Sequence, residues 1–499
     1  MTVGVSAFAA CSSSKSSTPT TPSTAAKAAA PAHSATTRPA ASAAFVPAPV
    51  QWRSCGSVDC AALEVPLDYA NPTGPRISLA LERVRAKHDR IGSMLINPGG
   101  PGAAGASFAQ DVAARLPSDI ADRFDIVGWD PRGTGASTAV NCGSKIDYLF
   151  APDTAPDTPA ELQQLEAASQ RFANACEAGS RDLLAHISTE DSARDMDSIR
   201  AALGDPRLTY LGFSYGTYLG AVYAQLFPQR VRALILDGAL DPSLTAEQSF
   251  TQQAQGFQQS FDRFLNSCAQ RSSCPLHNRG NPRAAYDTLR DRIERAPMEG
   301  SQARTLGPTQ LDIAVSSPLY EGASADDRLA SELHAGLGGD PNPLLDEFSQ
   351  YMERSGDGSY STTWPAFLAI SCLDGPVLPL QPLIAAQRRA AVAAPDFGAA
   401  NAGLGFPCAF WPVPARHPNG VRVSAPTAPP IMVVGTTGDP ATPYQEAISL
   451  TQQLGSARLV TVEGSSHTSL LYGNPCLLDA ARRYLIDLVP PPVGLRCGA

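Results

Sequence analysis

The 499-residue sequence lacks the features that are typical of transmembrane, nucleic-acid-binding and metal-binding proteins. No run of 18 apolar residues occurs, so we expect no transmembrane helix. Charged residues make up only 17%, and 38 basic against 47 acidic side chains give a net charge of −9, which disfavours a nucleic-acid partner. Tight Cys-x-x-Cys or Cys/His clusters are lacking, so we predict no zinc or other metal site, and no motif indicates an organic cofactor. The hydrophobic content of 43% is typical of a globular protein.

The sequence does contain eleven cysteines, of which ten are scattered beyond residue 50. Scattered cysteines without a metal motif indicate disulfides and an oxidising compartment. Ten cysteines allow about 945 pairings, and the sequence does not choose among them. We favour pairing between neighbours, and the alternative is a set of free buried thiols in a cytosolic enzyme. The favoured pairs are Cys55 with Cys60, Cys142 with Cys176, Cys268 with Cys274, Cys372 with Cys408, and Cys476 with Cys497.

The eleventh cysteine, Cys11, follows a short stretch of small and apolar residues at 3–10. A Ser/Thr/Pro/Ala tract then continues to about residue 44, and such a tract serves as a flexible spacer. The arrangement resembles a bacterial lipoprotein signal, although Phe8 stands where that signal usually has Leu and the cationic region is missing. The resemblance implies export, lipid attachment at Cys11 and a location at the outer face of the cell membrane. The alternative is an N-terminal tail with an incidental cysteine.

Short apolar runs that end in glycine-rich loops recur along the rest of the chain. Such runs are typical of parallel strands that are buried on both faces. Helical patterns at 190–203 and 218–226 alternate with them. The alternation predicts an α/β fold with a doubly wound, mostly parallel sheet. The predicted strands are 77–81, 93–96, 124–129, 208–212, 231–236, 431–434 and 459–462.

The pattern changes between about 245 and 400, where the sequence is rich in Gln, Arg and Ala and poor in strand-like runs. We interpret this region as an inserted, mainly helical cap that limits how a substrate reaches the site. The predicted organisation is therefore a signal and tether at 1–46, a first core part at 47–244, a cap at 245–400, and a second core part at 401–499.

A G-x-S-x-G motif centred on Ser214 joins the predicted strand at 208–212 to the following helix. In this context the glycines permit a sharp turn that exposes the serine hydroxyl above the sheet. We therefore predict that Ser214 is a nucleophile, against the alternative of a turn built from small residues. A serine hydroxyl needs a base to act in this way.

Two later loops supply residues for that base and its partner. His467 follows the strand at 459–462, and Asp439 follows the strand at 431–434, which is the chain order that this kind of turn predicts. His467 would accept the proton of Ser214, and Asp439 would orient the imidazole. The alternatives are a surface histidine and an aspartate that only caps a helix.

Stabilisation of a tetrahedral oxyanion requires two backbone N–H donors. Tyr215, directly after the nucleophile, would supply one. The other is expected from the Asn-Pro-Gly-Gly-Pro-Gly loop at 97–102, where we favour Gly100 and keep Gly99 as the alternative. The competing interpretation is a tight Gly/Pro turn without a catalytic role.

Taken with these motifs, the chain resembles the tripeptidyl-aminopeptidase-like branch of the α/β hydrolases, which is akin to proline iminopeptidases. Proline iminopeptidases carry His where this chain has Pro98, so the likeness is to the branch. It implies an α/β-hydrolase fold, release of short peptides from N-termini and cleavage of simple esters. Asp130 and Arg132 are interpreted as structural residues beside the site. The resemblance extends from about residue 50 to the end, through the segments 97–102, 129–137, 195–200, 212–217, 237–242, 369–374, 438–443 and 464–467.

Three functions stay open from the sequence. A serine aminopeptidase needs an anionic group for the substrate ammonium, for which Asp374 and Glu321 are candidates, although we favour structural roles for both. A carboxylesterase would use the same acyl-enzyme chemistry on esters. An inactive surface-binding protein is the third hypothesis, and the intact set of Ser214, Asp439 and His467 argues against it. The expected partner is thus a peptide or ester substrate.

Overall fold

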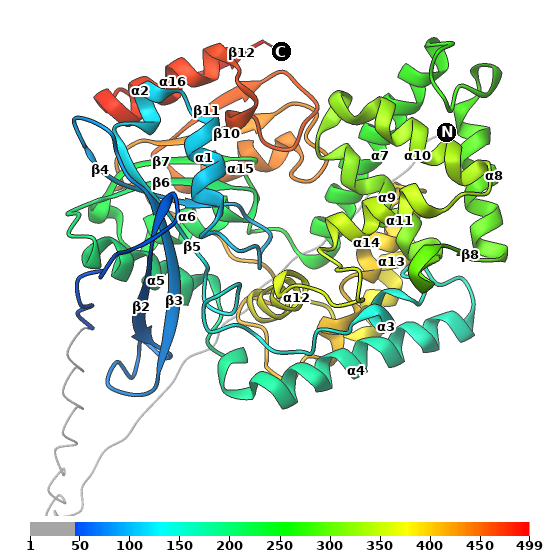
Figure 1. Cartoon of the computed structure of the whole chain (residues 1–499), viewed down its shortest axis with the longest axis horizontal. Coiled ribbons are helices and arrows are strands. Elements are labelled where there is room, and N and C mark those ends of the chain that lie inside the picture. Colours follow the sequence, from blue (N-terminus) through cyan, green and yellow to red (C-terminus); the bar gives the residue numbers. More distant parts are fainter. Residues whose placement is uncertain (1–44, 499) are drawn as a thin grey trace, which may run out of the picture. The chain divides into compact units, whose positions relative to one another are not determined.

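A computed structural model describes residues 45–498. The predicted lipid attachment at Cys11 lies outside the described residues, as does nearly all of the predicted signal and tether. Within 45–498, ten strands form one sheet in the order β1-β2-β3-β5-β4-β6-β7-β10-β11-β12 (Figure 1). None of the helices described in this range is long and apolar enough to cross a membrane.

The sheet is antiparallel at one edge and parallel through the rest. Strands β1, β2, β3 and β5 pair in antiparallel fashion. From β5 the sheet continues in parallel through β4, β6, β7, β10 and β11 to β12. The strands are β1 (Arg53–Cys55), β2 (Val58–Pro66), β3 (Arg76–Val84), β4 (Gly92–Asn97), β5 (Phe124–Trp129), β6 (Leu208–Phe213), β7 (Val231–Asp237), β10 (Ile431–Thr436), β11 (Ala457–Val462) and β12 (Leu495–Cys497).

Helices cover both faces of this sheet, because successive side chains of a strand point to opposite faces. In β4, Met94 and Ile96 pack with α1, α2 and α16 on one face, while Leu95 joins the cluster that includes α5, α6 and α15. The predicted α/β fold with a doubly wound, mostly parallel sheet is therefore confirmed. These helices are α1 (Phe108–Arg115), α2 (Ser118–Ala121), α5 (Thr189–Ala202), α6 (Tyr215–Leu226), α15 (Tyr444–Leu454) and α16 (Pro475–Asp487).

Helices dominate the segment between β7 and β10. Besides 3₁₀ turns, it has only one small strand pair among its described elements, β8 (Met298–Glu299) with β9 (Thr305–Leu306). The helices are α7 (Ala246–Gln270), α8 (Pro282–Arg295), α9 (Pro308–Leu319), α10 (Asp326–Leu337), α11 (Asn342–Tyr351), α12 (Thr363–Asp374), α13 (Leu380–Ala393) and α14 (Gly398–Gly403) (Figure 1). The helical character matches the expectation for 245–400, and the division into core and cap stays a prediction.

One long helix outside that segment packs against it. After the short α3 (Asp147–Phe150), α4 (Pro159–Leu184) begins with a capping box formed by Thr158 and Glu161. It contacts α12 and the 3₁₀ turn Phe406–Phe410, and its Leu165 lies in a cluster with Leu383 of α13. The helices that pack with the segment between β7 and β10 thus include one that precedes β6 in the chain.

Five disulfides join the ten cysteines of the described chain in the neighbour pattern. Their Cα–Cα distances run from 4.0 to 5.9 Å. Cys372–Cys408 links α12 to the turn Phe406–Phe410 across 36 positions of sequence, whereas Cys55–Cys60 closes a turn of only five. The other pairs are Cys142–Cys176, Cys268–Cys274 and Cys476–Cys497.

We expect removal of Cys372–Cys408 by paired Cys→Ser substitutions to lower the free energy of unfolding more than removal of Cys55–Cys60. A longer closed loop loses more chain entropy when it is cross-linked in the unfolded state, and the difference for these two loops is about 1–2 kcal/mol. Denaturant titration of the two double variants measures it. An equal loss in both would contradict the loop-entropy explanation.

Candidate active site

Ser214 stands at the sharp turn between β6 and α6. Its backbone has φ 55° and ψ −125°, a conformation that costs a residue with a side chain about 1–3 kcal/mol. The close packing of this turn requires glycine, since a Cβ on Gly212 would lie 2.3 Å from the carbonyl oxygen of Gly216. The N–H of Ser214 donates to the carbonyl of Asp237 at 2.9 Å, and Thr217 donates to the Ser214 carbonyl. The turn therefore holds the serine above the sheet.

His467 and Asp439 lie in the loops after β11 and β10. The His467 Nδ1 atom is 2.9 and 3.0 Å from the two carboxylate oxygens of Asp439. The same carboxylate accepts hydrogen bonds from the N–H groups of Ala441 and Thr442, both at 2.9 Å. These bonds orient the carboxylate toward the imidazole, so the predicted acid–histidine contact is present in the structure.

The second contact of the expected triad, between His467 and Ser214, is not formed. His467 Nε2 is buried and has no hydrogen-bond partner among the described residues, so it does not bond to Ser214. Ser214 and His467 nevertheless line one cavity of about 410 Å³, which we call the Ser214 cavity. Catalytic hydrogen bonds are often long in free enzymes and shorten when substrate binds. Space for the ring comes from Gly238, where a Cβ would lie 3.1 Å from His467 Cε1.

Opposing effects act on the pKa of His467. Burial lowers this pKa, but the charge and hydrogen bond of Asp439 and the charge of Asp237 together raise it above its ordinary value of 6.5. Asp237 is itself buried, which raises its pKa to about 6, so it is mainly ionised at neutral pH. The two carboxylates therefore favour the imidazolium that forms when a histidine acts as a base.

The loop at 97–102 lies against the start of α6. A Cβ on Gly99 would be 2.8 Å from Ser214 Cβ and 3.2 Å from the Tyr215 nitrogen, so the two backbones are in contact. The Gly99 N–H donates to the Asn97 side chain at 3.0 Å and is thereby occupied. Gly100 lines the Ser214 cavity. This geometry favours Gly100 over Gly99 as the companion of Tyr215 in an oxyanion hole.

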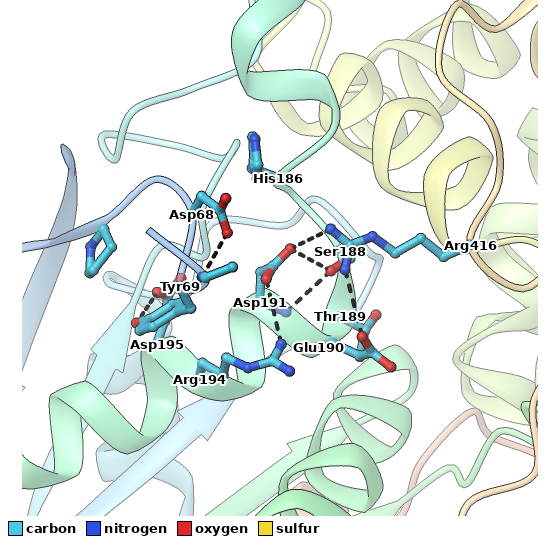
Figure 2. Close-up of polar contacts among 12 residues, drawn as sticks. Asp68, Tyr69, His186, Ser188, Thr189, Glu190, Asp191, Arg194, Asp195 and Arg416 are labelled. Atoms are coloured by element: carbon cyan, nitrogen blue, oxygen red, sulfur yellow. Dashed lines mark hydrogen bonds and ion pairs between the residues drawn. The ribbon is translucent and has the colours of Figure 1, made fainter. Parts of the chain in front are cut away.

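Asp130 and Arg132 organise the neighbouring loops. Arg132 is fully buried and forms two 2.7 Å hydrogen bonds to Asp195. Asp195 also accepts a hydrogen bond from Tyr69 (Figure 2). Asp130 accepts hydrogen bonds from the N–H groups of Ala106 and Ala136. Neither residue lines the Ser214 cavity, which agrees with the structural interpretation.

The two acids proposed from sequence for the substrate ammonium already have partners. Asp374 accepts from the N–H of Thr189 at 2.9 and 3.1 Å and from its hydroxyl, and burial raises the pKa of Asp374 to about 7. It borders an adjacent apolar pocket of about 230 Å³ that shares Gly100 with the Ser214 cavity. Glu321 is exposed and pairs with Arg328. Neither acid lines the Ser214 cavity.

The sequence analysis missed a different acid, Asp312, which does line the Ser214 cavity. It lies in α9 within the apolar run from Leu311 to Val315. A lone acid on an apolar helix is the only signal that could have marked it. Metal ligands are not grouped here: no cluster of three His, Cys, Asp or Glu side chains in residues 45–498 could hold an ion.

Comparison with known proteins agrees with this geometry. Residues 92–474 match the family described as alpha/beta hydrolase fold. A serine protease named Hip1 from Mycobacterium tuberculosis is 38% identical, covering 90% of this chain and 91% of that protein. Carboxylesterase B from the same species is 37% identical over 94% of both chains. A tripeptidyl aminopeptidase from Streptomyces coelicolor is 31% identical, covering 89% of this chain and 85% of that protein.

The chain belongs to the α/β-hydrolase family. The resemblance to its tripeptidyl-aminopeptidase-like branch is confirmed, and so is the prediction of a serine hydrolase.

Activity is expected to fall as pH drops through the pKa of His467, because an imidazolium cannot accept the Ser214 proton. The midpoint should lie above 6.5, since the two carboxylates raise this pKa. In Asp439→Asn those effects weaken while burial still lowers the pKa, so the midpoint of any residual activity moves to lower pH. The same variant should lose about 10⁴-fold in kcat through the wrong tautomer. Profiles of kcat/KM against pH measure both, and a flat profile through the acid range would count against His467 as the base.

Proposed function

We propose that this protein is an exported serine peptidase that releases short peptides from the N-termini of its substrates. The observation that carries the proposal is that Ser214 and His467 line one cavity with helices of the 245–400 segment, while Asp439 contacts His467. Ser214 would attack the scissile carbonyl and give its proton to His467. The N–H groups of Gly100 and Tyr215 would stabilise the oxyanion. His467 would then protonate the leaving amine, and water would release the acyl group.

The cap assignment rests on what lines the Ser214 cavity. Gln253 and Phe257 come from α7, Phe367 from α12, and Ala400 and Asn401 from α14. Side chains of the 245–400 segment thus form much of its wall, while the proposed chemistry belongs to the core loops. An enclosed wall limits how much peptide extends past the nucleophile, which favours action at a chain end.

A carboxylesterase is the second candidate. The adjacent apolar pocket favours it, because leucine, valine and aromatic side chains there would suit an acyl chain. The similarity to a protein named carboxylesterase B supports the same alternative. Both functions use one acyl-enzyme, so substrate assays and not site geometry separate them.

The proposed location is outside the cytoplasm. Five disulfides in the described chain support an oxidising compartment. Lipid attachment at Cys11 would hold the enzyme at the outer face of the membrane, and its support is the sequence pattern alone.

Ser214→Ala is expected to lower turnover of peptide amides and short acyl esters by about 10⁴- to 10⁶-fold and to abolish labelling by a fluorophosphonate. Ser169→Ala is the matched control, since this buried hydroxyl in α4 has no partner among the described residues and is not at the Ser214 cavity. Comparing peptide amides with esters on the unmodified enzyme identifies the function. Substantial activity in Ser214→Ala would refute the nucleophile.

Phe367→Ala, in the wall of the Ser214 cavity, is expected to change the ratio of peptide to ester turnover by about tenfold. Fluorophosphonate labelling of Ser214 should stay near normal, because the small reagent does not need the wall. Val392→Ala, on an exposed part of α13, is the control within the same segment. Parallel loss of labelling and of both turnovers would mean that the segment supports the fold and does not select substrates.

A further inference from the structure

Asp312 in α9 is a buried carboxylate without a partner. The residue is only 7% exposed, and it lines the Ser214 cavity together with Ser214 and His467. Its carboxylate makes no hydrogen bond or ion pair within the described chain, and Ser316, one turn along, donates to the Asp312 backbone carbonyl instead. A buried acid without a partner is unfavourable, so its presence at a reaction cavity calls for a ligand.

Other deeply buried acids in this protein have the partners that Asp312 lacks. Asp195 pairs with Arg132, and Asp237 accepts two backbone N–H groups. Asp374 is held by Thr189, while Glu446 accepts the N–H of Asp241. These bonds give each of those acids a structural role. Asp312 has none of them and is the acid among these that lines the Ser214 cavity.

No positively charged side chain of the described chain forms an ion pair with Asp312. Arg290 of α8 is the group of opposite sign whose charge lowers the pKa of Asp312, but the ion pairs of Arg290 are with Glu294 at 3.9 Å and Asp396 at 3.5 Å. Burial raises the pKa of Asp312 to about 8, Arg290 lowers it, and Asp153, Glu294 and Asp396 raise it again. Tyr286, also on α8, is near enough for its pKa to be raised by Asp312. The Asp312 carboxyl group is thus largely protonated at neutral pH.

We propose that Asp312 binds the α-ammonium group of the peptide substrate and so sets where the substrate N-terminus lies relative to Ser214. This inference rests on the proposed peptidase function and adds to it the residue that would make the enzyme act at a free N-terminus. An ammonium group supplies the charge and the hydrogen-bond donors that the carboxylate lacks, and a charge-assisted pair of this kind is strong in a water-poor cavity.

The position of Asp312 relative to Ser214 would also set the length of the peptide that is released. The acid belongs to α9, whereas the nucleophile belongs to the turn between β6 and α6. A peptide held at both points would span the Ser214 cavity, so the length released would follow from the separation of the two groups. Aromatic side chains of Phe257, Tyr320 and Phe397 line the cavity around the peptide.

Binding by Asp312 requires a proton to leave. At a pH below about 8 the free acid is mostly protonated and the peptide amine is an ammonium. Forming the ammonium–carboxylate pair converts the acid to its anion and releases one proton to the buffer. The pair should therefore weaken as pH falls further below 8, because more work is then needed to remove that proton.

The test uses the full chain with Ser214→Ala, so that bound peptide is not turned over. We expect calorimetry at about pH 6.5 to show trialanine binding at least tenfold more tightly than N-acetyl-trialanine. Adding Asp312→Asn should remove this preference and the proton release seen when buffers of different ionisation enthalpy are compared. Adding Glu294→Gln is the matched control. This substitution removes one of the acids whose charge acts on Asp312, and Glu294 does not line the Ser214 cavity.

Equal binding of the two peptides by Ser214→Ala would overturn the proposal, and so would loss of the preference in the Glu294→Gln control as large as in Asp312→Asn. We expect Asp312→Asn to melt no lower than its parent, because the acid has no partner to lose; a large drop would indicate a structural role. Asp312→Glu provides a second variant that keeps the charge and should keep the preference for the free amine. Its loss there would also refute the assignment.

Fluorophosphonate labelling separates this inference from the proposed function. Labelling of Ser214 in the otherwise unmodified chain tests the nucleophile and does not involve an ammonium group. Normal labelling with no preference for the free amine would reject Asp312 as the ammonium site and leave the serine hydrolase intact. Absence of labelling would reject the proposed catalytic function itself.

Discussion

The carboxyl end of β7 connects the two loops on which the proposed chemistry depends. The backbone carbonyl of Asp237 accepts the Ser214 N–H, and its carboxylate accepts the N–H groups of Ser469 and Leu470 just after His467. One buried residue therefore ties the serine turn to the histidine loop. Its charge also favours the imidazolium of His467. Without this link, two segments separated by some 250 positions of chain would have no common anchor beside the cavity.

The hydrogen-bonded residues at the carboxyl ends of β6, β7 and β10 contrast with Asp312 of α9, whose carboxylate has no hydrogen-bond partner in the described chain. Asp439, Asp237 and the turn at Ser214 are all held by several hydrogen bonds, which would keep the proposed reacting groups in place before substrate arrives. Asp312 lines the Ser214 cavity with no such bonds. A buried acid of this kind lowers stability, and proteins tolerate such a group where a ligand completes it.

Much of the fold could be predicted because parallel strands that are buried on both faces have continuous apolar sequences. The predicted strand at 124–129 coincides with β5, and the runs at 93–96 and 431–434 lie within β4 and β10. Strand β2, which lies between the edge strand β1 and β3, was not predicted, because the buried Asp59 and the exposed Glu64 interrupt its apolar pattern. The packing of α4 against α12 was not predicted either, since amphipathic periodicity identifies a helix but not its neighbour.

The sequence by itself determined the local chemistry: the turn at Ser214, the order of Ser214, Asp439 and His467, and the strands that carry them. These features follow from backbone conformation and from apolar patterns over a few residues. Tertiary structure alone decided which acids have partners. Asp374 meets Thr189 and Asp312 meets none, although both are aspartates on apolar helices. Hydrogen-bond partners that are far apart in sequence depend on how helices pack. The residues next to each acid in the sequence do not predict that packing.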